Sequence, residues 1–509
     1  MSNPLYDTLF GRHSGQETPF LHLTNGQTIT HGAFLRLAAQ FANLLTSKGL
    51  APGDRIAVQI AKSPEALALY AASVQAGLIF LPLNTGYTPA EVTYFVQDSG
   101  ARLFVCDPER EAQLGPVAAN AGAMLETLSG SGGGTLTVQA AQLPQTFETC
   151  PRTGDDLAAF LYTSGTTGRS KGAMLTQTNL LSNAQALCDL WQFTDRDVLL
   201  HALPIFHTHG LFVATNITLI AGGSMIFLPG FDLDAMIAGL PRATAMMGVP
   251  TFYTRLLDDA RFDADLTKNM RLFVSGSAPM LSETHVAFHR RTGHRILERY
   301  GMTETNMNTS NPYAGERRAG TVGFPLPGVE LKITDPATGA TLPDGQIGVI
   351  EVRGPNVFKG YWQMPEKTAE ELREDGFFIT GDLAKIDGDG YVHIVGRAKD
   401  LIISGGYNIY PKEIELVLDD QPGVKESAVI GVPHPDFGET VVAIVVPENG
   451  SQPTAEALLD ATNHAMARFK QPRKLIFADE LPRNTMGKVQ KKLLRDQYGH
   501  LFSGTDKAR

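Results

Sequence analysis

The segment LAAFLYTSGTTGRSKGAML, residues 157–175, joins an apolar run to a stretch of small, hydroxyl and basic side chains. The apolar run is typical of a buried strand, and Gly165 and Gly168 allow the backbone amides that follow to turn toward an anion. Lys171 adds a positive charge. The spacing does not fit the Walker pattern, because Gly172 follows Lys171 where Ser or Thr is required. The segment therefore predicts a phosphate-binding loop of another kind, with an ordinary polar turn as the alternative.

Strand-like and helix-like segments alternate on both sides of this loop, up to about residue 395. Residues 64–77 have the pattern of a helix between two strands. Buried strands are predicted at residues 55–61, 78–83, 101–107, 157–163 and 271–277. Alternation of this kind predicts an α/β fold with several layers.

The pattern changes near residue 396. Residues 426–447 predict a hairpin that turns around His434-Pro435-Asp436, and residues 456–469 predict one helix. We therefore expect a large multi-subdomain N-terminal α/β domain followed by a small mobile α+β C-terminal domain. The expected division is residues 1–396, a hinge at 397–400, and residues 401–509.

The composition excludes several classes of protein. The net charge of −10 argues against a general nucleic-acid binder. The sequence has no apolar run long enough to span a membrane, and its first residues lack the pattern of a secretion signal. Three cysteines, Cys106, Cys150 and Cys188, lack metal-ligand spacing. Unpaired thiols indicate a reducing, cytoplasmic location.

Four further motifs follow the loop. They are YGMTE (300–304), ITGD (379–382), GRAKDLIISGGYNIYPKEIE (396–415) and LPRNTMGKVQKKLL (481–494). With YTSGTTGRSKG they resemble, in kind and in order, the adenylate-forming superfamily of acyl-CoA synthetases, peptide-synthetase adenylation domains and luciferases. The resemblance covers most of the chain. It implies two steps: a carboxylate attacks the α-phosphate of ATP to give acyl-AMP, and the thiol of coenzyme A then displaces AMP.

The resemblance implies a nucleotide site with Mg²⁺. Glu304 would hold the metal ion, and Thr303 would donate to the α-phosphate. The residues expected at the β- and γ-phosphates are Thr163, Ser164, Gly165, Thr166, Thr167 and Lys171. Those expected around adenine and ribose are Ser275, Gly276, Ser277, Ala278, Tyr300, Asp382 and Arg397. Taken alone, an Asp after Thr-Gly could equally form a turn.

The C-terminal motifs imply a movement between the two steps. Lys488 would bridge the substrate carboxylate and the α-phosphate as charge develops. Its acylation would remove that charge and could silence the enzyme. Lys399 falls at the hinge, and Ser404, Gly405 and Gly406 would line the path of the thiol. The basic C-terminal segment would help to bind the phosphates of coenzyme A.

Two arginines distinguish the acyl pocket. Arg299 is expected at the tip of a strand that ends near Leu297, and Arg255 follows a Val-Pro-Thr turn. Buried guanidiniums need an anionic partner, and a second carboxylate on the substrate would supply it. The alternatives are surface pairs, of Arg299 with Glu298 and of Arg255 with the nearby aspartates 258 and 259.

Other side chains complete the expected pocket. Ser277 could donate to the same carboxylate, and Met302 belongs to the apolar lining. His207 could shield the acyl group or could simply pack in the core. The combined pattern is similar to the malonyl-CoA synthetase branch, which implies malonate or methylmalonate as the acid. A CoA ligase for a short monocarboxylic acid, an amino-acid adenylation module and an inactive sensor are the alternatives.

Overall fold

The computed structural model describes residues 2–163, 170–404, 407–484 and 487–502. The order of elements confirms the expected mixed α/β architecture. Within these ranges, no helix combines the length and apolar character needed to cross a bilayer. The cysteines at 106, 150 and 188 are all unpaired.

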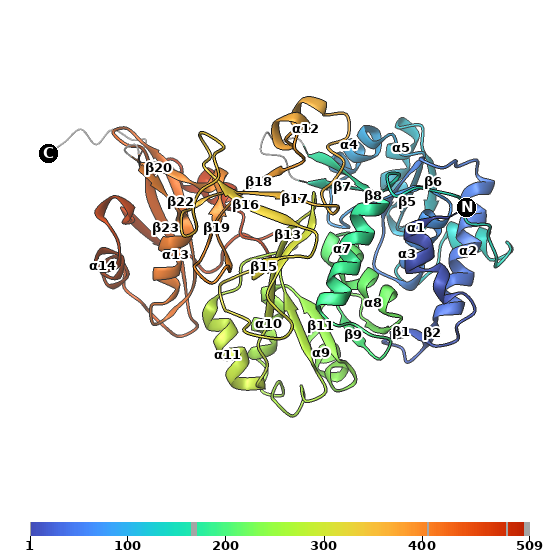
Figure 1. Ribbon diagram of the computed structural model, residues 1–509, viewed down its shortest axis with the longest axis horizontal. Helices are drawn as coiled ribbons and strands as arrows, with labels where there is room; N and C mark the ends of the chain where they lie inside the picture. Colours follow the sequence, from blue (N-terminus) through green and yellow to red (C-terminus); the bar gives the residue numbers. More distant parts are fainter. Residues whose placement is uncertain (1, 164–169, 405–406, 485–486, 503–509) are drawn as a thin grey trace.

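A six-stranded sheet forms the N-terminal layer, on the right of Figure 1. The predicted strands at 55–61, 78–83, 101–107 and 157–163 all lie in it. Its strands, in spatial order, are β6 (Met124–Thr127), β5 (Leu103–Cys106), β3 (Arg55–Gln59), β4 (Ile79–Pro82), β7 (Leu157–Thr163) and β8 (Lys171–Thr176). Helices α2 (His31–Ser47), α3 (Pro64–Gln75), α4 (Pro89–Ser99), α5 (Glu111–Asn120) and α6 (Thr135–Ala140) accompany the sheet. Strand β8 runs antiparallel to β7, with Lys171 opposite Thr163. The two ends of the predicted phosphate loop are therefore neighbours.

A nine-stranded sheet follows in the fold. In spatial order it contains β15 (Phe324–Pro325), β14 (Asn306–Ser310), β13 (Leu297–Met302), β12 (Leu272–Ser275), β11 (Ala245–Gly248), β9 (Val198–His201), β10 (Ser224–Phe227), β1 (Pro19–Leu23) and β2 (Thr28–Thr30). The helices in this part of the chain are α7 (Gln177–Leu190), α8 (Asn216–Ala221), α9 (Leu233–Gly239), α10 (Pro250–Leu257) and α11 (Ser282–Thr292), and α1 (Pro4–Leu9) lies against α7. A π-helix, His209–Thr215, leads into α8. One continuous core joins both sheets.

Two smaller sheets complete the chain, on the left and at the centre of Figure 1. The first contains β16 (Glu330–Thr334), β17 (Gly348–Arg353), β18 (Phe378–Ile386) and β19 (Val392–Arg397), with α12 (Pro365–Glu371) between β17 and β18. The second contains β20 (Ile402–Ser404), β21 (Tyr407–Ile409), β22 (Val424–His434), β23 (Gly438–Pro447) and β24 (Lys474–Phe477), with α13 (Pro411–Asp419), α14 (Ala455–Ala465) and α15 (Lys491–Tyr498). The second sheet has its own core, as expected of a small α+β unit.

Two local predictions are wrong. Arg299 lies inside β13, which continues to Met302 because β14 pairs with it in antiparallel register and places Ser310 opposite Arg299. The helix predicted at 456–469 ends at Ala465. Met466 takes an extended backbone there and packs on the core of the small sheet, and a separate 3₁₀ turn covers Arg468–Lys470.

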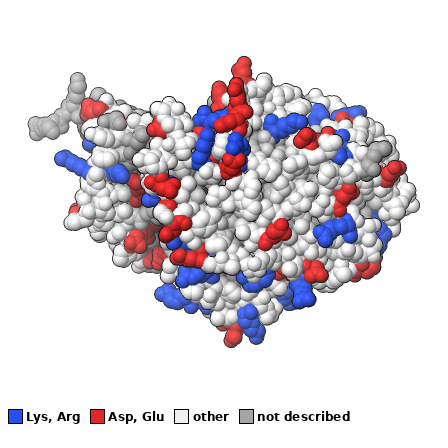
Figure 2. All heavy atoms as spheres, in the orientation of Figure 1, with Lys and Arg blue, Asp and Glu red and all other residues white. Residues whose placement is uncertain are grey.

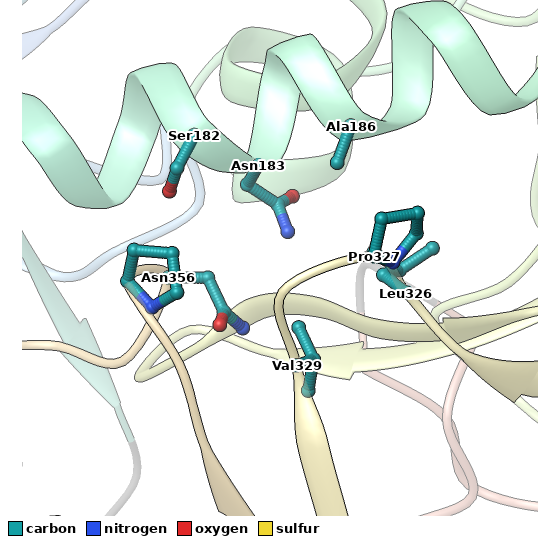
Figure 3. Close-up of a pocket in the computed structure, with 8 residues that line it drawn as sticks. Ser182, Asn183, Ala186, Leu326, Pro327, Val329 and Asn356 are labelled. Carbon is teal, nitrogen blue, oxygen red and sulfur yellow. The ribbon is translucent and has the colours of Figure 1, made fainter.

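Two asparagines, one on α7 and one in the loop after β17, hold the start of β14 in place. The Nδ2 of Asn183 donates to the carbonyl of Met307 at 2.7 Å, and its Oδ1 accepts from the Met307 amide at 3.2 Å. Asn356 donates to the carbonyl of Thr305 at 2.8 Å. Both side chains line a cavity of about 40 Å³ between α7 and the loops near Pro327 (Figure 3). A space of this size suits about one water molecule, so the substrate site lies elsewhere.

Replacing Asn183 tests how much its two hydrogen bonds to Met307 contribute to stability. We expect Asn183→Ala to lower the free energy of unfolding by about 1–3 kcal/mol, because the buried amide of Met307 loses its Asn183 partner and the carbonyl keeps only the longer bond from Asn356. The midpoint of thermal unfolding measures the loss. Asn25→Ala, at an exposed asparagine, is the matched control. Equal midpoints for the two variants would show that the hydrogen bonds of Asn183 contribute nothing to stability.

Candidate active site

Arg299 is a buried cation with unused donors. Its side chain is 4% exposed, and its Nε and Nη2 have no hydrogen-bond partner within the described part of the chain. The guanidinium lies flat against Gly276, where an added Cβ would sit 2.3 Å from its Cζ. Burial lowers the pKa of Arg299 to about 9. A planar fork with two free N–H groups in a buried position is suited to a carboxylate.

The surface pair expected as an alternative for Arg299 is not formed. Glu298, the preceding residue, points to the opposite side of β13, as alternation along a strand requires. Its carboxylate accepts from the amide of Gly320 at 3.3 Å and lies 3.3 Å from Nδ1 of His285. Arg299 therefore has no carboxylate partner in the described chain.

Two histidines share the pocket with Arg299. His207 is half-buried, and burial, then the charges of Lys488 and Arg299, lowers its pKa to about 3. His209 is fully buried, and burial followed by Arg299 holds its pKa well below the usual value. Both rings are therefore neutral at pH 7. The amide of His209 donates to Nδ1 of His207 at 3.4 Å, which leaves the Nε2 of His207 as its proton-bearing nitrogen.

Ser277 stands at the edge of the same pocket in a strained conformation. Its φ of +70° is uncommon for a residue other than glycine. Its Oγ lies 3.3 Å from Nδ1 of His209, while the Nε2 of His209 is buried and has no hydrogen-bond partner in the described ranges. The strained turn thus brings a hydroxyl and a neutral imidazole to the region around Arg299.

Lys488 reaches this pocket from the C-terminal domain. Its amide donates to Oδ1 of Asn484 at 2.9 Å, and Gly487 before it has a φ of +74° and lies near Thr251 of α10. Burial is the main cause that lowers the pKa of Lys488 to about 8, and the charge of Arg397 adds to it. The positive charges of Lys488, Arg299 and Arg397 thus lie near one another.

The residues expected around adenine and ribose gather at Asp382. Tyr300 donates to its Oδ2 at 2.6 Å, and the Nε of Arg397 lies 3.1 Å from its Oδ1. Burial, reinforced by Asp382, raises the pKa of Tyr300 well above its usual value. On β12, Ser275 is buried and its Oγ has no partner among the residues that the structure describes, and Gly276 and Ala278 follow it. The structure therefore brings the expected adenine and ribose residues together.

Two carboxylates, those of Glu304 and Glu371, lie among the residues expected at the phosphates. Thr163 donates to Oε1 of Glu304 at 3.3 Å, and the hydroxyl of Tyr361 lies 3.0 Å from the same oxygen. Lys171 lies 3.1 Å from Glu371 and over the ring of Tyr361. Thr303 is half-buried just before Glu304. The expected phosphate residues Ser164, Gly165, Thr166 and Thr167 lie outside the described residues.

The remaining expected residues are more scattered. Arg255 is exposed on α10, with its guanidinium 5.5 Å from the ring of Phe231, and the structure does not bring it to Arg299. Met302 is half-buried at the end of β13. Lys399 is exposed in the turn between β19 and β20, and Ser404 ends β20. Gly405 and Gly406 lie outside the described residues.

Three residues of the site were not anticipated. His209 stands two positions after His207 in PIFHTHG, and this repeated histidine was the available signal. Tyr361 and Glu371 reach the residues expected at the phosphates from a loop and a helix about 200 positions after Lys171. No local pattern in the sequence marks such a distant contact.

Comparison with known proteins identifies the family of the chain. Residues 12–362 match the family model of the AMP-binding enzyme, and residues 413–488 match its C-terminal domain. A feruloyl-CoA synthase of Amycolatopsis sp. is 36% identical, covering 93% of this chain and 95% of its own. A malonate–CoA ligase of Arabidopsis thaliana is also 36% identical, covering 88% of this chain and 78% of its own.

A solved structure is more similar. The ATP-bound crystal structure of MatB from Rhodopseudomonas palustris is 56% identical, with a TM-score of 0.97 over 99% of this chain and 100% of its own. The apo crystal structure of the same protein gives a TM-score of 0.86. With both family models matched in order and most of the chain covered, this protein belongs to the AMP-binding enzyme family, the adenylate-forming superfamily.

Proposed function

We propose that this protein is an ATP-dependent acid–CoA ligase that converts malonate, ATP and coenzyme A to malonyl-CoA, AMP and diphosphate. The observation that carries the choice of acid is the buried guanidinium of Arg299, whose Nε and Nη2 have no hydrogen-bond partner among the described residues. A second carboxylate on the substrate would satisfy both. The name of the malonate–CoA ligase relative supports the same reaction class, and the similar MatB structure has ATP bound.

Sequence identity alone does not choose this acid. The feruloyl-CoA synthase, whose name indicates an aromatic monocarboxylic acid, is as similar as the malonate ligase. A short monocarboxylic acid is therefore the second candidate. It would leave Arg299 buried beside two neutral histidines with no anion in reach, which costs free energy. The pocket chemistry favours the dicarboxylic acid.

The proposed roles in the first step follow the geometry. The second carboxylate of the acid accepts from Arg299, with Ser277 beside it and His207 covering the acyl group. The reacting carboxylate and the α-phosphate share the ammonium of Lys488 and the hydroxyl of Thr303. Because both reactants are anions, this work is positioning and charge neutralisation.

In this proposal, ATP binds on the side of the site that carries Asp382 and Lys171. Asp382 accepts from the ribose hydroxyls, with Arg397 fixing the carboxylate, and Tyr300 lies against adenine beside the Ser275–Ala278 turn. Lys171 and Thr163 serve the β- and γ-phosphates. The adjoining loop residues 164–167 share this role in the proposal.

The residues present fit a Mg²⁺ ion near Glu304. One phenolic proton of Tyr361 serves two carboxylates, so the site carries spare oxygen acceptors. Among the described residues, no group of three or more His, Cys, Asp or Glu side chains forms a metal cage. Magnesium, which prefers a single carboxylate plus phosphate oxygens, suits such a site. When bound, it would neutralise phosphate charge.

The second step requires a different arrangement of the C-terminal domain. We propose residues 1–396 and 401–509 as the two bodies, with a hinge at 397–400 that includes Lys399. The loop from Ser404 through residues 405 and 406 would then face acyl-AMP and line the path of the thiol. The three unpaired cysteines support a cytoplasmic location.

Removing the guanidinium tests the proposed acid. We expect Arg299→Met to lower kcat/KM for malonate by at least about 100-fold, because a charge-assisted bidentate contact is lost. The value for acetate should change by less than about threefold. The measurement is AMP production with malonate, methylmalonate, succinate, acetate and propionate. Arg290→Met, at an exposed arginine on α11, is the control. A wild-type preference for acetate would contradict the proposal.

Lys488 should affect one half-reaction. We expect Lys488→Ala to reduce malonate-dependent exchange of labelled diphosphate into ATP by at least about 100-fold, because the bridging charge is lost. Thioester formation from synthetic malonyl-AMP should remain within about threefold. Equal losses in both assays would contradict a role confined to adenylation.

The rate of adenylation should also depend on pH through this lysine. The ammonium form is the active one, and the pKa of Lys488 in the free protein is lowered to about 8. Deprotonation above that pH removes the charge, so kcat/KM for malonate should fall as pH rises through about 8. A profile that stays flat to pH 9.5 would contradict this assignment.

A further inference from the structure

Glu371 is an acid in an unfavourable place for its own helix. It is the last residue of α12, where the helix dipole disfavours negative charge. Figure 2 shows acidic side chains at the edge of the molecule where Figure 1 places α12. Within α12 the carboxylate has one compensating contact, the i,i+4 pair with Lys367, and its remaining contacts lie outside the helix.

Those contacts lead to Lys171. The Nζ of Lys171 lies 3.1 Å from Oε2 and 3.2 Å from Oε1 of Glu371, and 4.1 Å from the centre of the Tyr361 ring. Lys171 is 8% exposed, and about a fifth of the Glu371 side chain is exposed. This is a partly buried ion pair between residues 200 positions apart in the sequence. It fixes the direction of a long, flexible lysine.

The carboxylate is itself held from two other sides. Tyr361 donates to its Oε2 at 2.6 Å, and Lys367 on the same helix lies 2.9 Å from its Oε1. The hydroxyl of Tyr361 also lies 3.0 Å from Oε1 of Glu304. One chain of contacts thus joins Lys171 to the carboxylate of Glu304. Glu371 can stay in place while Lys171 uses a remaining N–H group for another anion.

We propose that Glu371 is a positioning residue for adenylation: it holds the ammonium of Lys171 where the β- and γ-phosphates of ATP arrive. Through the contacts of Tyr361, it also fixes the position of that lysine relative to the Glu304 carboxylate. Without Glu371 the lysine would lose its anchor and would have to give up side-chain freedom when ATP binds. The inference rests on the phosphate role proposed for Lys171. It is independent of which acid the protein activates.

The test compares two neighbouring glutamates. Glu371→Gln keeps a hydrogen-bond acceptor for Tyr361 but removes the charge that pairs with Lys171. Glu370→Gln removes a charge that pairs with Lys367 on the exposed side of the same helix. We expect Glu371→Gln to raise KM for ATP about tenfold, with KM for malonate and for coenzyme A changed by less than about twofold. Glu370→Gln should leave all three within about twofold of wild type.

Two further variants make the outcome decisive. Glu371→Asp keeps the charge on a shorter stem and should recover part of the affinity for ATP, which a purely structural defect would not predict. An unchanged or lowered KM for ATP in Glu371→Gln would overturn the inference, because it would mean that Glu371 is idle or competes with the phosphates. Lys171→Ala should raise KM for ATP more than Glu371→Gln does. No effect in Lys171→Ala would instead overturn the phosphate role on which the inference rests.

Discussion

A buried guanidinium, with no carboxylate partner in the part of the chain that the structure describes, is the main constraint on this site. Arg299 lies inside β13, in contact with the backbone of Gly276 and near two histidines that burial keeps neutral. The free energy of burying such a charge is recovered when a carboxylate arrives with the substrate. The same contact would then select a dicarboxylic acid and supply binding free energy, because it offsets the cost of burying the charged arginine.

The scaffold keeps this charge in position through backbone contacts. Strand β13 pairs with β12 on one side and with β14 on the other, and Asn183 donates a hydrogen bond to the Met307 carbonyl of β14. Glycine at 276 leaves room for the guanidinium, and the strained turn at Ser277 aims a hydroxyl at His209. The turn between β13 and β14 carries Thr303 and Glu304, so the residues proposed for acid recognition and for phosphate chemistry share one support. Lys488, from the C-terminal domain, is buried near Arg299 and Glu304.

Much of this could be predicted from the sequence where information is local. The strand at 157–163 agrees residue for residue with β7, and the hairpin around His434 formed as expected. The strand-tip position of Arg299 was wrong, because an antiparallel partner further along the chain extends β13. Met466 similarly ended α14 early because it packs on a core assembled from distant strands. Pairs far apart in the sequence, such as Lys171 with Glu371, leave no periodic signal at all. The role of Arg255 remains a prediction.

The central claim is that charge on the second carboxylate is recognised, and the most direct measurement isolates that charge. Malonate and its monomethyl ester share the reacting carboxylate and the carbon skeleton, and they differ in one negative charge. Their affinities can be measured by isothermal titration of the wild-type protein with a nonhydrolysable ATP analogue present. The account predicts that malonate binds at least about tenfold more tightly than the ester. Equal affinity for the two would contradict it, because Arg299 would then bind no carboxylate.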